Sequence, residues 1–120
     1  MTIFTDNIGF GPHGIEIVNN TIFVCSGSNL LGFDLEDGSQ ILDYNLNATF
    51  LNGITHSNQD LYISDFGDKI LYRYNFLKNN IEIISTFEER PNGVCFDEFN
   101  NRILVVCWGS NAPIYEVDLI

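Results

Sequence analysis

Basic residues are scarce in this chain of 120 residues, which has 5 Lys and Arg against 16 Asp and Glu and a net charge of −11. A protein that binds nucleic acid neutralises phosphates with Lys and Arg, and an anionic membrane surface attracts the same residues. We therefore expect no nucleic-acid partner and no membrane partner. A surface this acidic favours solubility, cations and basic partners.

Long hydrophobic runs are also lacking, so we expect no segment that spans a bilayer. The N-terminal residues 1–6 carry neither the basic stretch nor the apolar stretch of a secretory signal, and the default expectation is a cytoplasmic protein. Cys25, Cys95 and Cys107 include no pair with CxxC spacing, which predicts reduced thiols on strands in the core. Helical periodicity is absent as well, and the class indicated is all-β.

The clearest positive feature is an internal repeat. Gly14, Gly53 and Gly93 are 39 and 40 residues apart, and each precedes Ile or Val. A β-rich run follows each of them, then a closing glycine, then another run that ends in an aromatic or β-branched residue plus Asp or Asn. These runs are 21–25, 60–64 and 102–107, and the closing glycines are Gly27, Gly67 and Gly109. The same features in the same order at one period indicate repeated supersecondary units.

Each unit is predicted to be a set of short strands joined by tight polar turns. Pairs such as Asn19-Asn20, Asp37-Gly38 and Asn79-Asn80 suit turns that need positive φ. A fourth strand is expected at 40–45 and at 81–87. Four antiparallel strands in about 40 residues are typical of a β-propeller blade, with the glycine-rich start as the innermost strand.

This pattern divides the single domain 1–120 into three blade units of about 12–50, 51–90 and 91–120. The third unit lacks its fourth strand, which the strand-like residues Thr2–Thr5 could supply. Three blades cannot close a ring, because propellers carry four to eight. Two alternatives follow: two chains close a six-bladed homodimer, or the missing half belongs to a longer protein.

The repeats resemble a known superfamily. Pro91–Asp97, followed by Arg102–Val106, is similar to the six-bladed propellers of the gluconolactonase–regucalcin superfamily, and Asp60–Asp65 with Ile70–Tyr74 is similar to the NHL repeat. The resemblance covers the whole chain but half of a family propeller. It implies a divalent cation such as Ca²⁺ at the mouth of a central channel, with Asn52 and Asn92 at ligand positions.

Three further residues are candidates for ligand binding. His13 falls at the matching place in the first unit, where a plain loop histidine is the alternative. Asp65 ends a second strand and could line the channel mouth, and Trp108 either fills the gap between blades or stacks on a sugar ring. Asn52 and Asn92 themselves have the alternative of capping local backbone groups in turns.

Three functions follow from this sequence. The first is a non-catalytic module that binds a small molecule or a protein through the loop-bearing face of the propeller. The second is a metal-dependent hydrolase of sugar lactones, in which the cation polarises the carbonyl and activates water. The third is a fragment whose site lies partly in blades of a longer protein.

Overall fold

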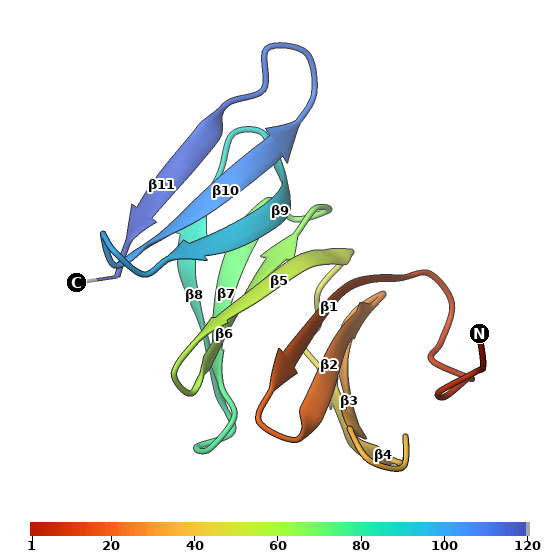
Figure 1. The fold of residues 1–120 in the computed structure, drawn as a ribbon. Helices are drawn as coiled ribbons and strands as arrows, with labels where there is room; N and C mark the ends of the chain where they lie inside the picture. The colour runs from red at the N-terminus through yellow and green to blue at the C-terminus, as the bar shows by residue number, and fades with distance from the viewer. Residues whose placement is uncertain (120) are drawn as a thin grey trace.

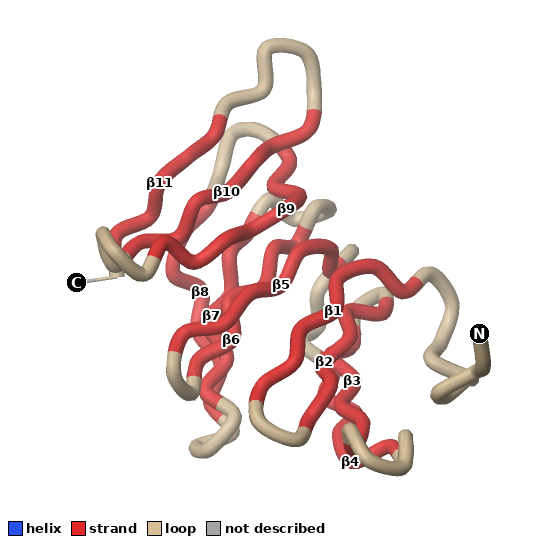
Figure 2. The backbone as a smooth tube through the Cα atoms, in the orientation of Figure 1, coloured by secondary structure: helices blue, strands red, loops and turns tan. Residues whose placement is uncertain are grey.

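The computed structural model describes residues 1–119, and in this part of the chain it has strands and no helix (Figure 2). The prediction of an all-β chain with repeated antiparallel units is confirmed. Eleven strands form three antiparallel sheets. Sheet 1 contains β1 (Pro12–Val18), β2 (Thr21–Ser26), β3 (Asn29–Asp34) and β4 (Gln40–Asn45). Sheet 2 contains β5 (Leu51–Ser57), β6 (Asp60–Asp65), β7 (Ile70–Asn75) and β8 (Asn80–Thr86), and sheet 3 contains β9 (Arg90–Asp97), β10 (Arg102–Trp108) and β11 (Ile114–Asp118).

Sheet 2 lies between the other two (Figure 1). The first strands of the three sheets, β1, β5 and β9, run side by side, and each sheet then extends outward from them in chain order. Glycines permit this close approach. A Cβ atom on Gly14 would overlap the carbonyl oxygen of Asn52, and one on Gly53 would overlap the carbonyl oxygen of Asn92. The two contacts between neighbouring sheets are thus made in the same way.

The first hairpin of every sheet turns on an asparagine with positive φ. Asn19, Asn58 and Asn101 have φ values of 53°, 54° and 52°, and each lies one or two residues before the second strand of its sheet. Among residues with a side chain, Asn is one of the few that tolerate this left-handed region. The abundance of Asn in the sequence is therefore used locally to set the hairpins.

The two larger of the three core clusters lie on the two faces of sheet 2. Leu61 and Ile63 of β6 have no exposed surface and pack toward sheet 1. Tyr62, between them in sequence, is 3% exposed and packs toward sheet 3 with Ile103 and Val105 of β10. Because side chains alternate along a strand, a run of consecutive apolar residues must be covered on both faces. The apolar run of β6, residues 61–63, follows from its place in the middle sheet.

The two end sheets are covered on one face only. In β10, Val105 is fully buried against sheet 2, whereas Val106 and Trp108 on the opposite face are 46% and 63% exposed. In β1, Ile15 and Ile17 are 64% and 51% exposed on the face of sheet 1 that points away from sheet 2. The expected ring is accordingly not formed by one chain: three sheets stand in a row and do not close.

The N-terminal segment lies against the outer face of sheet 1. Ile8 packs on a small cluster of Val24, Leu31 and Phe33, and its carbonyl oxygen accepts a 2.9 Å hydrogen bond from the hydroxyl of Ser26. Residues 2–5 form no strand, and within one chain they do not complete sheet 3. No helix in the described residues is long and apolar enough to cross a membrane.

The expectation of three core thiols is wrong for one of them. Cys25 and Cys107 are buried, but Cys95 is exposed on the outer face of sheet 3. The alternation of β9 places Val94 and Phe96 against sheet 2 and turns Cys95 the other way. The pattern of a strand does not reveal which of its two faces a neighbouring sheet covers.

Candidate functional site

Four rings form a row across all three sheets, at the end where β1, β5 and β9 begin. His13 of β1 packs on Phe50 with ring centroids 4.6 Å apart, Phe50 lies 5.6 Å from Phe66, and Phe66 lies 5.9 Å from Trp108 in an edge-on contact. We call these four residues the aromatic row. Its two ends, His13 and Trp108, are exposed, and its two middle members are half-buried.

Asp65 holds the middle of the aromatic row in place. It is fully buried, and its Oδ1 accepts hydrogen bonds from the backbone N–H groups of Phe50 and Gly67 at 2.9 Å and from that of Asp68 at 3.2 Å. Its Oδ2 accepts the N–H of Thr49 at 2.9 Å. One carboxylate thereby fixes the segment before β5 and the turn after β6, which carry the two phenylalanines.

Arg90 covers the row from the side of sheet 3. Its guanidinium carbon lies 5.3 Å from the centre of the Phe66 ring, and its Nη1 donates a 3.1 Å hydrogen bond to the carbonyl oxygen of Phe66. A guanidinium over an aromatic face is attracted by the ring quadrupole. This end of the molecule therefore offers flat apolar surface, a cation and the imidazole of His13 together.

The structure places the three predicted ligand-binding residues at one end, but in different roles. His13 and Trp108 are surface members of the aromatic row. The Trp108 ring is 63% exposed in the single chain and contacts Phe66, which follows β6 of the neighbouring sheet. Asp65 was expected to line the mouth of a channel; it lies beneath the row and binds only backbone groups. Asp65 is thus a positioning residue for the surface.

Sequence reasoning missed Phe50, Phe66 and Arg90. A signal for them is present in the repeat: Phe50 directly precedes β5, Arg90 opens β9, and Phe66 directly follows β6 just as Trp108 ends β10. Equivalent places in neighbouring units meet at the same end of a stacked repeat. Aligning the units by residue number would have brought these side chains together.

Asn52 and Asn92 occupy equivalent places on the adjacent strands β5 and β9. Their backbone carbonyls are taken up by contacts between sheets: that of Asn52 faces Gly14, and that of Asn92 accepts a 2.6 Å hydrogen bond from the hydroxyl of Ser64. Ser64 in turn accepts the N–H of Gly53 at 2.8 Å. Among residues 1–119, no group of three or more His, Cys, Asp and Glu side chains is arranged to hold a metal ion. The expected cation ligands thus remain a prediction.

A cavity of about 530 Å³ lies at the opposite end, between the hairpins of sheets 2 and 3. His56 is part of its lining, and the Nδ1 atom of His56 lies 3.2 Å from a carboxylate oxygen of Glu16 on β1. The cavity lining also includes Glu98 and the ring of Phe96, so it combines polar and apolar surface. Ser57 lies beside His56 in this lining, and no hydrogen bond joins these two described side chains.

The buried cysteines are unsuited to nucleophilic chemistry. Burial raises the pKa of the Cys25 thiol to about 12. Burial also raises the pKa of the Cys107 thiol, and the nearby carboxylate of Glu89 raises it further. Because the thiolate is the reactive form, both groups stay protonated and inert at neutral pH.

Comparison with known proteins corrects the family resemblance. No family model matches the chain, and no curated protein matches it. Among solved structures it is similar to the computationally designed protein Ika4, with a TM-score of 0.70 and 6% sequence identity over 91% of this chain and 66% of Ika4. The designed protein Ika8 has a TM-score of 0.48 and 6% identity over 90% of this chain and 46% of that one. The chain thus spans about two thirds of Ika4 and under half of Ika8, and the likeness concerns the fold alone.

The identification with the gluconolactonase–regucalcin and NHL families is therefore wrong. The residues on which it was based have a structural explanation. Pro91–Asp97 is the strand β9, whose glycine lies where strands of neighbouring sheets approach closely, and Asp60–Asp65 is the doubly covered strand β6. These residue types are thus explained by packing between sheets and are no evidence of ancestry or activity.

Proposed function

We propose that this chain is a self-assembling binding module. Two copies join through the free faces of sheets 1 and 3 and close a ring of six sheets, a six-bladed β-propeller with a two-fold axis. The aromatic row of each copy lies on one end of the ring and binds a small molecule or a protein segment. Assembly is the part of this proposal that the geometry supports most directly.

The proposal is based on a glycine–carbonyl contact that joins neighbouring sheets twice, while the third equivalent glycine has no such partner among the described residues. Gly14 fits against the carbonyl of Asn52, and Gly53 fits against the carbonyl of Asn92. Gly93 holds the same place in sheet 3, yet a Cβ atom there would meet only a methyl group of Val106, at 3.1 Å. In a second copy, the residue equivalent to Asn52 and Asn92 is His13, at the start of sheet 1. Repeating the same step across two chains brings the partner's His13 to Gly93.

The two free faces have the character of an interface. On sheet 3 a shallow, largely apolar cavity of about 320 Å³ is lined by Leu104, Val106 and Ile114 together with Gly93, Val94 and Cys95. On sheet 1 the exposed side chains of Ile15 and Ile17 lie beside the cluster under Ile8. Soluble monomers seldom leave two such faces open, and a two-fold pair covers both at once.

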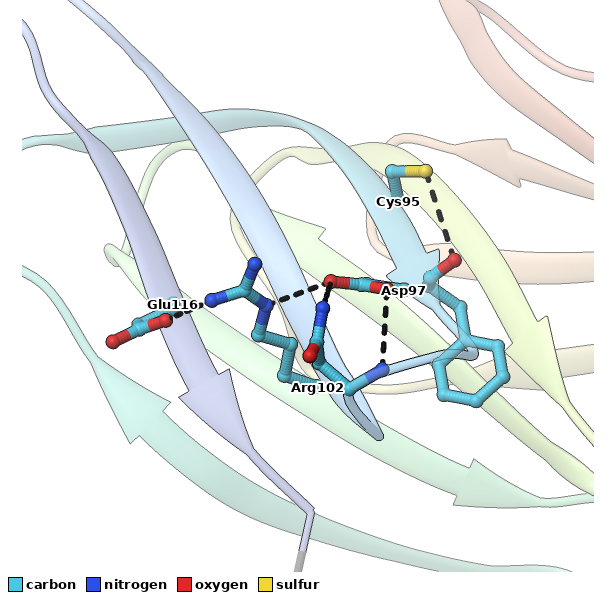
Figure 3. A network of polar contacts seen from close by, with 6 residues as sticks. Cys95, Asp97, Arg102 and Glu116 are labelled. Atoms are coloured by element: carbon cyan, nitrogen blue, oxygen red, sulfur yellow. Dashed lines mark hydrogen bonds and ion pairs between the residues drawn. The ribbon is translucent and has the colours of Figure 1, made fainter.

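A group of charged side chains lies at one end of the outer face of sheet 3. Arg102 Nε lies 2.8 Å from the carboxylate of Asp97, and its guanidinium also binds Glu116 on the neighbouring strand (Figure 3). These three charged side chains bind one another, so they need no partner from a second chain. The apolar centre remains the part that gains from a partner.

Light scattering behind a sizing column tests the proposal, with an alanine pair as matched variants. The chain of 13.6 kDa is expected to elute at about twice that mass. Gly93→Ala should convert it to a folded monomer, because the added methyl group blocks the contact between chains and within the chain meets only a methyl group of Val106, which a small shift accommodates. Gly53→Ala should instead lower the melting midpoint of the monomer, because the methyl group overlaps a backbone carbonyl within the chain.

Cys95 supplies a second readout of the same interface. Its thiol is exposed in one chain and becomes covered in the ring, whereas Cys25 and Cys107 are buried in either state. Alkylation should therefore be slow in the parent and fast in Gly93→Ala. A parent protein that is a clean monomer with a reactive Cys95 would refute the proposed assembly.

The side chains near the aromatic row give no support to a metal-dependent hydrolase. The Asp65 carboxylate binds backbone groups, and among residues 1–119 no three His, Cys, Asp or Glu side chains are grouped to hold a metal ion.

A further inference from the structure

Sheet 3 is one strand short. β4 and β8 close the outer edges of sheets 1 and 2, whereas β11 pairs only with β10 and has no strand on its other side among residues 1–119. An open strand edge presents unpaired backbone N–H and C=O groups, which can pair with another strand. The edge of β11 is therefore a site for one added strand.

We propose that the N-terminal residues 2–6 of one copy form this strand in sheet 3 of the other copy, so that the two chains exchange strands as the ring closes. The inference rests on the proposed assembly and adds how the ring is locked. The segment carries suitable side chains, since Ile3 and Phe4 are 80% and 49% exposed in the single chain.

The spacing of the repeat fixes the register. Across sheet 1, Ile15, Val24, Leu31 and Asp43 lie opposite one another, and across sheet 2 the equivalent set is Ile54, Ile63, Tyr72 and Ile83. In sheet 3 the set is Val94, Val105 and Tyr115, with the fourth place empty.

The fourth member always precedes the first member of the next set by the same distance. Asp43 comes 11 residues before Ile54, and Ile83 comes 11 residues before Val94. Eleven residues before Ile15 is Phe4. Phe4 is therefore assigned the place opposite Tyr115 in the partner, and Ile3 the place opposite Glu116.

A space for Phe4 exists beside the edge of β11. A cavity of about 350 Å³ lies between the end of β8 and β11, and its lining includes Phe87, Tyr115 and Val117. The rings of Phe87 and Tyr115 are already in contact, with centroids 5.4 Å apart. A phenylalanine entering opposite Tyr115 would add a third ring to this pair.

The segment cannot reach this place within its own chain. It leads into β1 in sheet 1, and sheet 2 separates sheet 1 from sheet 3, with the two chain ends on opposite sides of the molecule (Figure 1). In the single chain the backbone of Phe4 lies against the turn at Gly38, and Ile8, two residues beyond the segment, covers Leu31 on the outer face of sheet 1. In the proposed exchange the segment leaves this turn, and Ile8 moves with it to free the outer face for the partner's sheet 3.

Disulfide trapping tests the register directly, in a background in which Cys95→Ser removes the exposed thiol. Ile3→Cys combined with Glu116→Cys should give a covalent dimer on mild oxidation, because directly opposed residues lie within the range of a disulfide. Thr2→Cys combined with Glu116→Cys is the matched control, since Thr2 is one residue out of register and points to the other face. The control should give little cross-linking.

A second pair of variants measures the contribution of the exchanged strand. Phe4→Ala should weaken dimerisation at least about 100-fold, as expected when a large buried side chain is truncated. Phe10→Ala, in the connecting segment where Phe10 is 100% exposed, should leave dimerisation unchanged.

The outcomes separate this inference from the proposed assembly. A dimer by mass that forms no cross-link between positions 3 and 116, or that tolerates Phe4→Ala, overturns the strand exchange. The proposed ring of two chains would then still stand. A cross-link within one chain overturns exchange between copies. A monomer that Gly93→Ala does not change overturns both.

Discussion

Replacing Asp65 with Asn hardly changes the shape of the side chain, yet we expect it to lower the stability of the fold strongly. Its carboxylate accepts four backbone hydrogen bonds in a site with no exposed surface. In Asp65→Asn the amide oxygen can take over the three bonds of Oδ1, to Phe50, Gly67 and Asp68. The amide NH₂ then faces the N–H of Thr49, so one bond is lost and a buried donor is left unpaired.

The size of the effect follows from these contacts. One unpaired buried donor costs about 1–3 kcal/mol, and the three remaining bonds weaken because a neutral acceptor replaces a charged one. Because the neutral amide does not carry the cost of burying a charge, part of this loss is offset. The net loss in the free energy of unfolding is about 3 kcal/mol. For a domain of this size, each kcal/mol shifts the melting midpoint by roughly 3–6 °C, so a fall of roughly 10–15 °C is expected.

Thermal unfolding followed by circular dichroism measures the shift, and Asp34→Asn is the control. Asp34 Oδ1 accepts the N–H groups of Glu36 and Asp37 in an exposed turn, and an asparagine retains that oxygen. Its Oδ2 accepts a long, exposed 3.4 Å hydrogen bond from the Asn20 amide, which water can replace. The control should stay within about 0.5 kcal/mol of the parent. If Asp65→Asn melts as close to the parent as Asp34→Asn does, the buried carboxylate does not organise this end of the molecule.

Two further predictions concern the aromatic row and the charges of sheet 3. Trp108 is the only tryptophan, so a ligand that binds the row, sought among oligosaccharides and short peptides, should change its emission, and Phe66→Ala should abolish the change; an unaltered response in Phe66→Ala would place binding elsewhere. Hydrogen bonds from Asn100 and Arg102 lower the pKa of Asp97, so its stabilising contribution is full above the unfolded pKa of about 4 and is lost as pH falls through the lower folded value. Urea midpoints of the parent and Asp97→Asn should thus differ at pH 7 and converge near pH 2, and a gap that persists at pH 2 would contradict this assignment.

The sequence was sufficient for the repeat because periodic glycines and asparagine turns act locally. Gly14, Gly53 and Gly93 mark the strands that touch between sheets, and Asn19 sets a hairpin whatever surrounds it. These requirements are met within a few residues, or by one neighbouring strand. They can therefore be read from spacing alone.

The candidate site was predictable only in part, because it depends on which surfaces are covered. His13 and Trp108 were recognised as candidates, yet the phenylalanines between them were not, since they belong to connections whose course the pattern does not give. Asp65 looks like any acidic strand end until its burial is known. The family resemblance was misleading for a related reason, because motifs that satisfy strand geometry recur without common ancestry.

The position of sheet 2 has a consequence for how this chain tolerates mutation. Every apolar side chain of β6 serves one of two interfaces, so a substitution there weakens the stack on whichever side it falls, and no position of the strand is free to drift. Each end sheet packs against only one neighbouring sheet in the single chain. Sequence change should consequently accumulate from the ends inward, and a lineage that lengthens or shortens the array would do so by gaining or losing an end sheet while the middle one stays fixed.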